Sequence, residues 1–120
     1  MEKYSKKRQF GNVGEDLAIK FLLERGSVII ERNVLRAWGE IDIVAMREGI
    51  LRIIEVKTAD IHSPIKPAEN MTFSKLKKCF RNAEIYVHEK RYMGEYQIDC
   101  IFVFTSFGEV VDIQLVESIV

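Results

Sequence analysis

The fold of this chain can be inferred most directly from residues 39–58, GEIDIVAMREGILRIIEVKT. Apolar and polar side chains alternate over Gly39–Met46, which is typical of a strand with one buried face. Glu48-Gly49 is a hairpin turn signal, and Ile50–Thr58 has the composition of a second strand. The stretch therefore predicts a β-hairpin. One face of its first strand is expected to carry Ile41, Ile43 and Ala45. One face of its second strand is expected to carry Leu51, Ile53, Glu55 and Lys57.

The residues before this hairpin predict a helix and a short strand. Apolar side chains recur at three–four spacing over Phe10–Arg25, which indicates an amphipathic helix. Gly26 is a residue type that often ends helices. Val28–Arg32 is then a short run of β-forming residues.

The residues after the hairpin predict a second helix and a further strand. Ala59–Met71 contains two prolines and is expected to be a loop, and Thr72 can cap a helix that runs to about Lys90. Tyr96–Phe104 is strongly strand-like, and a weak last strand is expected near Val110–Val116. The buried stripe of the second helix is expected to consist of Phe73, Leu76, Cys79, Phe80, Ala83 and Val87.

This order of elements favours an α/β domain. Three directly joined strands can form an antiparallel meander, whereas a helix between the third and fourth strands suggests a right-handed crossover to a parallel neighbour. The length of 120 residues suits a single domain over residues 1–120. We therefore expect a central mixed β-sheet flanked by helices, with an αβββαβ core.

The composition limits the classes of protein to consider. Hydrophobic residues make up 48% of the chain, enough for a core, but no apolar run approaches the length of a membrane span. A cytoplasmic protein with reduced cysteines and no membrane contact is expected by default. The net charge is zero, which counts mildly against non-specific nucleic-acid binding. Basic residues are nevertheless clustered in residues 3–8 and 75–81.

Two carboxylates and a lysine stand out within the predicted hairpin. Glu55 and Lys57 lie two residues apart, and Asp42 lies on the preceding strand, so strand pairing can bring the three side chains together. Two carboxylates suit a hard cation such as Mg²⁺ (or Mn²⁺), and a lysine can stabilise charge that develops on phosphorus. The alternative is a cross-strand ion pair that faces solvent. Charged side chains within such apolar strands cost folding free energy unless they are paired or bind a ligand, so the interpretation as a metal site stays open.

The sequence also resembles a known family, through four successive motifs. They are residues 11–18 (GNVGEDLA), 31–33 (ERN), 39–45 (GEIDIVA) and 55–58 (EVKT). In order and spacing these motifs resemble those of the YraN-like family of small bacterial proteins, which is similar to the PD-(D/E)xK superfamily. That resemblance covers roughly Phe10–Phe104. It implies a restriction-endonuclease-like fold and a nucleic-acid-binding domain with a Mg²⁺-dependent phosphodiesterase site. It also implies that Asp42 and Glu55 are metal ligands, that Lys57 is the catalytic lysine, and that Glu15 completes the acidic cluster.

The match has two departures, and Glu15 has a second interpretation. Ile41 stands where the superfamily name has proline, and Ala59 stands where the family often has arginine, which puts one phosphate contact in doubt. Asn12 followed by Glu15 is also a capping-box pattern, so Glu15 could serve the start of a helix instead of the site.

Several basic residues are candidates for contacts with a nucleic-acid backbone. Lys75 and Lys78 are three residues apart and can lie together on the second helix. A solvated helix face is the ordinary alternative. The full set of predicted nucleic-acid-binding residues is Arg32, Arg36, Lys75, Lys78 and Arg81.

Three functional hypotheses follow. The first is a Mg²⁺-dependent endonuclease or resolvase-like enzyme that hydrolyses phosphodiester bonds in DNA. The second is a non-catalytic nucleic-acid-binding module on the same fold, which would need the basic residues but not the carboxylates. The third is a protein-interaction domain, which the neutral charge allows. A homodimer is a further expectation, because resolvases that cut two strands symmetrically act as dimers.

Overall fold

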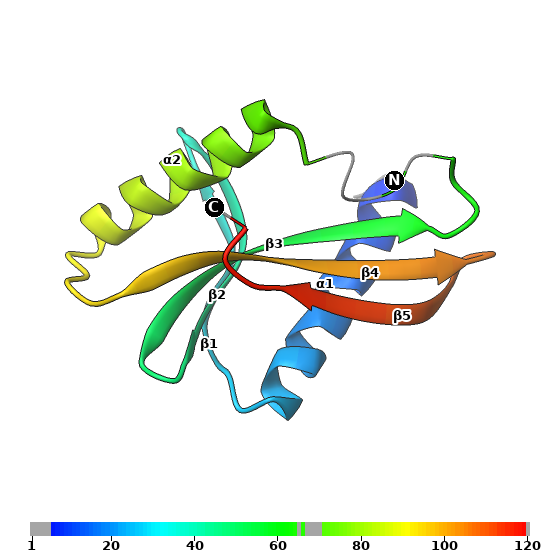
Figure 1. Ribbon diagram of the computed structural model, residues 1–120, viewed down its shortest axis with the longest axis horizontal. Coiled ribbons are helices and arrows are strands. Elements are labelled where there is room, and N and C mark those ends of the chain that lie inside the picture. Colours follow the sequence, from blue (N-terminus) through cyan, green and yellow to red (C-terminus); the bar gives the residue numbers. More distant parts are fainter. Residues whose placement is uncertain (1–5, 65, 67–70, 120) are drawn as a thin grey trace, which may run out of the picture.

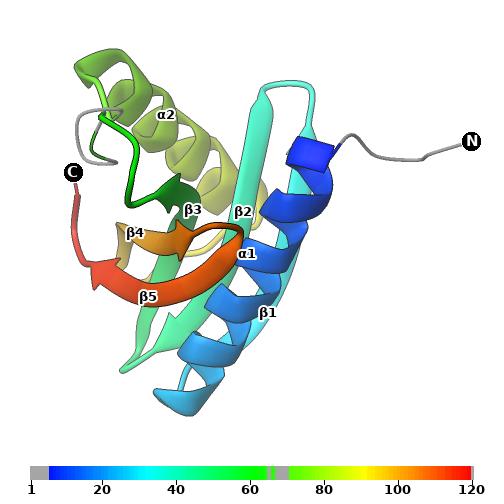
Figure 2. The same ribbon diagram turned by 90° about the vertical axis from the view of Figure 1, so that its right-hand side faces the viewer.

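The architecture is a five-stranded sheet with one helix on each face (Figures 1 and 2). The computed structural model describes residues 6–64, 66 and 71–119, and side chains from residue 13 onward. The α/β class and the predicted order of elements are confirmed. In chain order the elements are α1 (Lys6–Glu24), β1 (Val28–Arg36), β2 (Gly39–Arg47), β3 (Ile50–Asp60), α2 (Phe73–Glu89), β4 (Tyr96–Ser106) and β5 (Glu109–Val116).

The sheet has the mixed topology that the sequence predicts. The strands lie in the order β1-β2-β3-β4-β5. β1, β2 and β3 form an antiparallel meander, β4 is parallel to β3 after the α2 crossover, and β5 is antiparallel to β4. β3 is therefore the central strand, paired with β2 at Ile43–Ile54 and with β4 at Ile53–Ile98. None of the described helices is long and apolar enough to cross a membrane.

The face covered by α1 has its own apolar cluster. Ala18 and Leu22 of α1 pack on Ile43, Ile54 and Ile101 of the sheet. Gly14 allows this close approach, because a Cβ at this position would lie 2.6 Å from Thr58 Oγ1. The helix α1 therefore packs closely on the C-terminal half of β3, on the face opposite α2.

The face covered by α2 has a second cluster. Ala83, Tyr86 and Val87 of α2 pack on Leu51, Ile53 and Ile98, among other sheet residues. The Tyr86 hydroxyl donates a hydrogen bond of 2.9 Å to the Glu31 carboxylate, so the one polar group of this large buried side chain is satisfied. These contacts fix the C-terminal half of α2 against the sheet.

The expected alternation along β2 is wrong at one point. Ile41 was expected to share a face with Ile43 and Ala45, but it packs in the α2-side cluster while Ile43 and Ala45 pack on the α1 side. Strand alternation is therefore broken between Ile41 and Ile43, that is, at Asp42. A sequence pattern of period two cannot reveal such an irregularity.

Both predicted helices differ from expectation in detail. α1 begins at Lys6, so Asn12 lies inside the helix and cannot cap its start as the capping-box interpretation required. In α2, Phe73 and Phe80 were expected in the buried stripe, but they are 80% and 41% exposed. The buried residues of α2 begin only at Asn82, because its N-terminal half faces a cavity and not the packed core.

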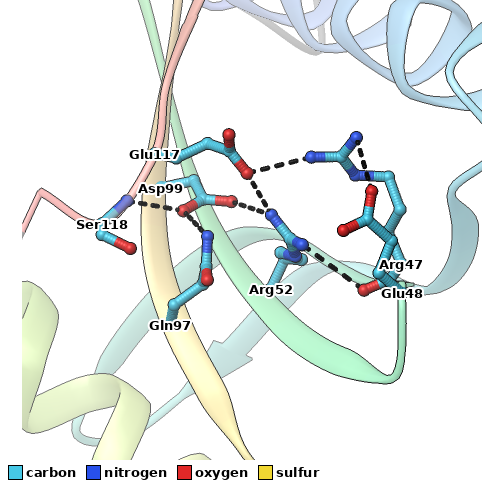
Figure 3. Close-up of polar contacts among 7 residues, drawn as sticks. All are labelled: Arg47, Glu48, Arg52, Gln97, Asp99, Glu117 and Ser118. Carbon is cyan, nitrogen blue, oxygen red and sulfur yellow. Dashed lines mark hydrogen bonds and ion pairs between the residues drawn. The ribbon is translucent and has the colours of Figure 1, made fainter.

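A polar network joins β3, β4 and the C-terminal segment (Figure 3). Arg52 and Asp99 are almost completely buried on neighbouring strands, and Arg52 Nη1 lies 3.6 Å from Asp99 Oδ2. Arg52 also binds Glu117, while Asp99 accepts hydrogen bonds from the Ser118 amide and the Gln97 side chain. The C-terminal segment is thus attached to the sheet by buried, charge-assisted contacts.

Candidate functional site

A cavity of about 260 Å³ lies between the N-terminal half of α2 and the sheet. The sheet side contributes the three residues singled out from the sequence, Asp42, Glu55 and Lys57. The helix side contributes two of the predicted phosphate-binding lysines, Lys75 and Lys78. Carboxylates and ammonium groups from distant parts of the chain therefore share one cavity. Its remaining lining residues are Glu40, Met71, Cys79 and Asn82.

Asp42 reaches the site because β2 departs from regular pairing there. The regular β2–β3 pairing runs from Arg47–Ile50 to Ile43–Ile54. Beyond it, Asp42 Oδ2 accepts a hydrogen bond of 2.8 Å from the Val56 amide. The side chain of Asp42 thus satisfies a β3 backbone donor, which fixes one carboxylate oxygen and leaves the other available for a ligand.

Glu55 and Lys57 project from β3 on the side covered by α2. Leu51 and Ile53 of the same strand pack in the α2-side cluster, so the period-two expectation holds along β3. Lys57 Nζ lies 3.1 Å from Glu55 Oε1, and both side chains are partly exposed. β4 pairs with β3 along this whole segment, with Cys100 beside Glu55 and Phe102 beside Lys57. The pair is therefore held on a rigid central strand.

The electrostatics of the site are dominated by crowded negative charge. Burial, and then the neighbouring Glu55 carboxylate, raise the pKa of Asp42 to about 7, although the Val56 hydrogen bond opposes the rise. Burial alone would lower the pKa of Lys57, but the Glu55 and Asp42 carboxylates outweigh it and raise the pKa above its ordinary value. The ammonium of Lys57 is thus held in its charged form, and Asp42 is in an environment that a cation would relieve.

Glu15 approaches the site from α1, on the other face of the sheet. It does not line the cavity. Burial raises the pKa of Glu15, and Arg32 opposes this. Glu15 Oε1 is buried and has no hydrogen-bond partner among the described residues. The charges of Glu40 and Glu55 also raise the pKa of Glu15, and the charge of Glu15 contributes to the raised pKa of Asp42. The described residues contain no group of three or more Asp, Glu, His or Cys side chains placed to hold a metal, so a role of Glu15 in the acidic cluster stays a prediction.

The donor set fits a hard divalent cation bound by two carboxylates. Mg²⁺ typically takes one or two protein carboxylates and completes its octahedral shell with water and phosphate oxygens. Asp42 and Glu55 offer such a pair, and burial together with the nearby Glu55 carboxylate raises the pKa of Asp42, an effect that a bound cation would oppose. Glu15 adds a buried carboxylate oxygen that has no hydrogen-bond partner among the described residues, and its charge contributes to the raised pKa of Asp42. The residues present therefore fit the metal that the sequence predicts.

The predicted phosphate-binding residues separate into two groups. Lys75 and Lys78 line the cavity, whereas Arg81 is exposed on α2 outside it. Arg32 lies 2.9 Å from Asp16 of α1, and Arg36 lies 3.2 Å from Glu89 at the end of α2. The structure thus brings two of the five predicted residues to the carboxylates and places the two arginines of β1 in ion pairs elsewhere.

Asn82 belongs to the cavity but was not singled out from the sequence. It is 5% exposed, its Nδ2 donates weakly to the Glu40 carbonyl at 3.4 Å, and its Oδ1 has no partner among the described residues. A Cβ at Gly39 would lie 2.7 Å from the Asn82 amide, so glycine is needed where β2 begins. Asn82 therefore supports the backbone two residues before Asp42. Its only sequence signal is a polar residue inside the apolar stripe of α2.

Comparison with known proteins places the chain in a family. The model of an uncharacterised protein family, UPF0102, matches residues 14–103, which include Asp42, Glu55 and Lys57. A UPF0102 protein of Sulfurimonas denitrificans is 38% identical over 97 residues, covering 80% of this chain and 86% of the relative. Another, from Dictyoglomus turgidum, is 36% identical over 107 residues, covering 88% and 91%. A third, from Clostridium perfringens, is 41% identical over 96 residues, covering 80% and 77%. The chain therefore belongs to the uncharacterised protein family UPF0102.

Proposed function

We propose that this protein is a divalent-metal-dependent endonuclease that hydrolyses phosphodiester bonds in DNA. The observation that carries the proposal is the convergence of Asp42, Glu55 and Lys57 with two lysines of α2 in one cavity. The resemblance to YraN-like proteins and the PD-(D/E)xK superfamily supports the same chemistry, because the matching residues are those that the geometry brings together. The helix–three-strand–helix–strand order is consistent with the fold of that superfamily.

Asp42 and Glu55 would hold Mg²⁺ or Mn²⁺. When bound, the metal would supply charge neutralisation at the scissile phosphate and a more acidic water. The Val56 hydrogen bond to Asp42 and the Lys57 contact with Glu55 orient the two carboxylates before any ligand arrives. Such preorganisation lowers the cost of binding a cation between two like charges.

Lys57 would act on the reacting phosphate. Its ammonium lies on the same face as Glu55 and is held protonated, so it can donate a hydrogen bond to a phosphate oxygen as negative charge develops there. It can also orient the attacking water by donating to its oxygen. Lys75 and Lys78, on the opposite wall of the cavity, would contact neighbouring phosphates and fix the strand in register. A cytoplasmic location would give the protein access to such a substrate.

The direct test is cleavage of a panel of labelled DNAs in Mg²⁺ and Mn²⁺. The panel contains a duplex, a single strand, a flap and a four-way junction. Wild type is expected to cleave at least one of them, and Glu55→Gln, purified in the same way, is expected to cleave none, because the substitution removes a carboxylate charge without changing side-chain size.

The same experiment separates the proposal from its alternatives. Equal cleavage by wild type and Glu55→Gln would show contamination and overturn the assignment. DNA binding that is sensitive to salt but accompanied by no cleavage in either metal would instead favour a non-catalytic nucleic-acid-binding module. Absence of DNA binding at low salt would favour a protein-interaction domain.

A further inference from the structure

The N-terminal half of α2 has an unusual surface for a helix that covers a sheet. From Phe73 to Arg81 none of its residues is buried. Its charged residues in this half are all basic, and the first acidic residue is Glu84. Two phenylalanines are exposed among these cations, Phe73 by 80% and Phe80 by 41%. Large apolar side chains in such positions commonly mark an interaction site.

The two rings and a lysine share one side of the helix. Phe73, Lys77 and Phe80 are separated by four and three residues, so they lie in a row along the axis. Lys77 Nζ lies 5.9 Å from the centre of the Phe73 ring. With a rise of about 1.5 Å per residue, the two rings are spaced by about 10 Å. The row therefore alternates an aromatic face, a cation and a second aromatic face.

The charge of this row selects among ligands. A purely apolar partner would leave Lys77 and the adjacent Arg81 desolvated without compensation. Nucleic acid with unpaired bases offers both complements, because bases stack on aromatic rings while phosphates pair with the ammonium and guanidinium groups. A duplex offers only the phosphates, since its bases are stacked on each other. The surface thus fits an unpaired strand better than a duplex.

The row is also connected to the candidate site. Lys75 and Lys78, on the other side of the same helical half, line the cavity that holds Asp42 and Glu55. Met71, which lines the cavity too, lies two residues before Phe73, so the cavity and the first ring of the row adjoin the same end of α2. That end carries no acidic residue in its first turn to repel phosphate.

We propose that Phe73 and Phe80 form a stacking surface that binds an unpaired stretch of nucleic acid next to the candidate site. The inference rests on the proposed function for the identity of the ligand, and it adds the substrate class. The protein would then act on strands with unpaired nucleotides, such as flaps, ends or junctions with open bases, in preference to a continuous duplex.

The test measures binding without cleavage. Fluorescence anisotropy in EDTA compares a labelled 15-nucleotide oligothymidine with a 15-base-pair duplex, using the full chain. Stacking of one base on an aromatic side chain corresponds to about five- to 150-fold in affinity. Phe73→Leu/Phe80→Leu is therefore expected to weaken oligothymidine binding by at least about fivefold, with less than about a twofold change for the duplex.

Two matched variants show whether stacking is the cause. Phe73→Trp/Phe80→Trp keeps the aromatic faces and is expected to keep or strengthen oligothymidine binding. Phe107→Leu removes a more exposed ring, 89% accessible, in the β4–β5 turn and is expected to leave the affinity for both ligands unchanged. Because Phe73 and Phe80 are exposed, all these variants are expected to fold, which circular dichroism checks.

The outcomes also distinguish this inference from the proposed function. Stacking-dependent binding of oligothymidine by a protein that never cleaves with metal would keep the inference and remove the nuclease assignment. Cleavage by wild type with unchanged oligothymidine affinity in Phe73→Leu/Phe80→Leu would remove the inference alone. Equal weakening of oligothymidine and duplex binding in Phe73→Leu/Phe80→Leu would also overturn the inference. A wild type that binds neither ligand would overturn it too, and would favour a protein partner for the two rings.

Discussion

A Lys57→Met variant is expected to lose roughly 10²–10³-fold in the rate of DNA cleavage while keeping its fold. The ammonium of Lys57 lies 3.1 Å from Glu55 Oε1 on the central strand, so it is positioned to donate to charge that develops on the phosphate. Methionine keeps most of the length of the unbranched side chain but removes the donor. Binding of a divalent cation is expected to persist, because Asp42 and Glu55 are retained and Glu55 loses its competing partner. Single-turnover cleavage measures the rate, and thermal denaturation with and without Mn²⁺ measures fold and cation binding.

Lys75→Met is the matched control for this prediction. Lys75 lies in the same cavity but on α2, across from the carboxylates. Its loss is expected to weaken DNA binding and its salt dependence, with a much smaller effect on the rate at saturating DNA. If Lys57→Met cleaves within about threefold of wild type, Lys57 does not stabilise the transition state, and an assignment of Lys57 as catalytic fails.

An Arg52→Met variant is expected to be less stable than wild type by about 3–5 kcal/mol. Arg52 is almost fully buried and provides the positive charge next to Asp99, which is only 1% exposed. Without Arg52, Asp99 keeps hydrogen bonds from Gln97 and the Ser118 amide but loses its countercharge (Figure 3). Glu117 also loses its ion pair with Arg52, so the C-terminal segment is expected to be held less firmly against the sheet. Equilibrium unfolding in urea measures the effect.

Two further variants test that reason. Arg47 binds Glu117 at 2.9 Å where Glu117 is half exposed, so Arg47→Met is expected to cost less than about 1 kcal/mol. Arg52→Met/Asp99→Asn removes both buried charges and is expected to recover much of the loss, because the uncompensated carboxylate is gone. A double variant as unstable as Arg52→Met would show that packing of the Arg52 side chain, and not the charge of Asp99, is what stabilises this end of the sheet.

Much of the architecture could be inferred from the sequence because its local signals agree. The Glu48-Gly49 turn fixes the β2–β3 hairpin, and apolar alternation along β3 correctly predicts that Glu55 and Lys57 share the face of Leu51 and Ile53. The helix between β3 and β4 forces a crossover, which explains why their parallel pairing was predictable. The topology, and the face of the sheet on which each β3 side chain lies, thus follow from sequence patterns a few residues long.

The details of the site depend on tertiary structure and could not be inferred in this way. The irregularity at Asp42 is invisible in an alternating pattern, yet it allows that carboxylate to bind the Val56 amide. The exposure of Phe73 and Phe80 also escaped prediction, because apolar spacing alone does not show that half of α2 lacks cover. The position of Glu15 relative to the cavity depends on how α1 packs on the other face of the sheet and not on motif spacing, so its place in the acidic cluster stays a prediction.

The central claim is that Asp42 and Glu55 together hold one divalent cation. Thermal denaturation of wild type and of Asp42→Asn, each with and without Mn²⁺, tests this claim most directly. Burial and the charge of Glu55 raise the pKa of Asp42 to about 7, so ionised Asp42 opposes folding when no cation is bound. Asp42→Asn, which removes that charge, is therefore expected to unfold at a higher temperature than wild type in EDTA. Mn²⁺ is expected to stabilise wild type and to leave Asp42→Asn unchanged. An equal Mn²⁺-induced shift in both proteins, or no shift in wild type up to millimolar Mn²⁺ even with DNA present, would contradict the claim.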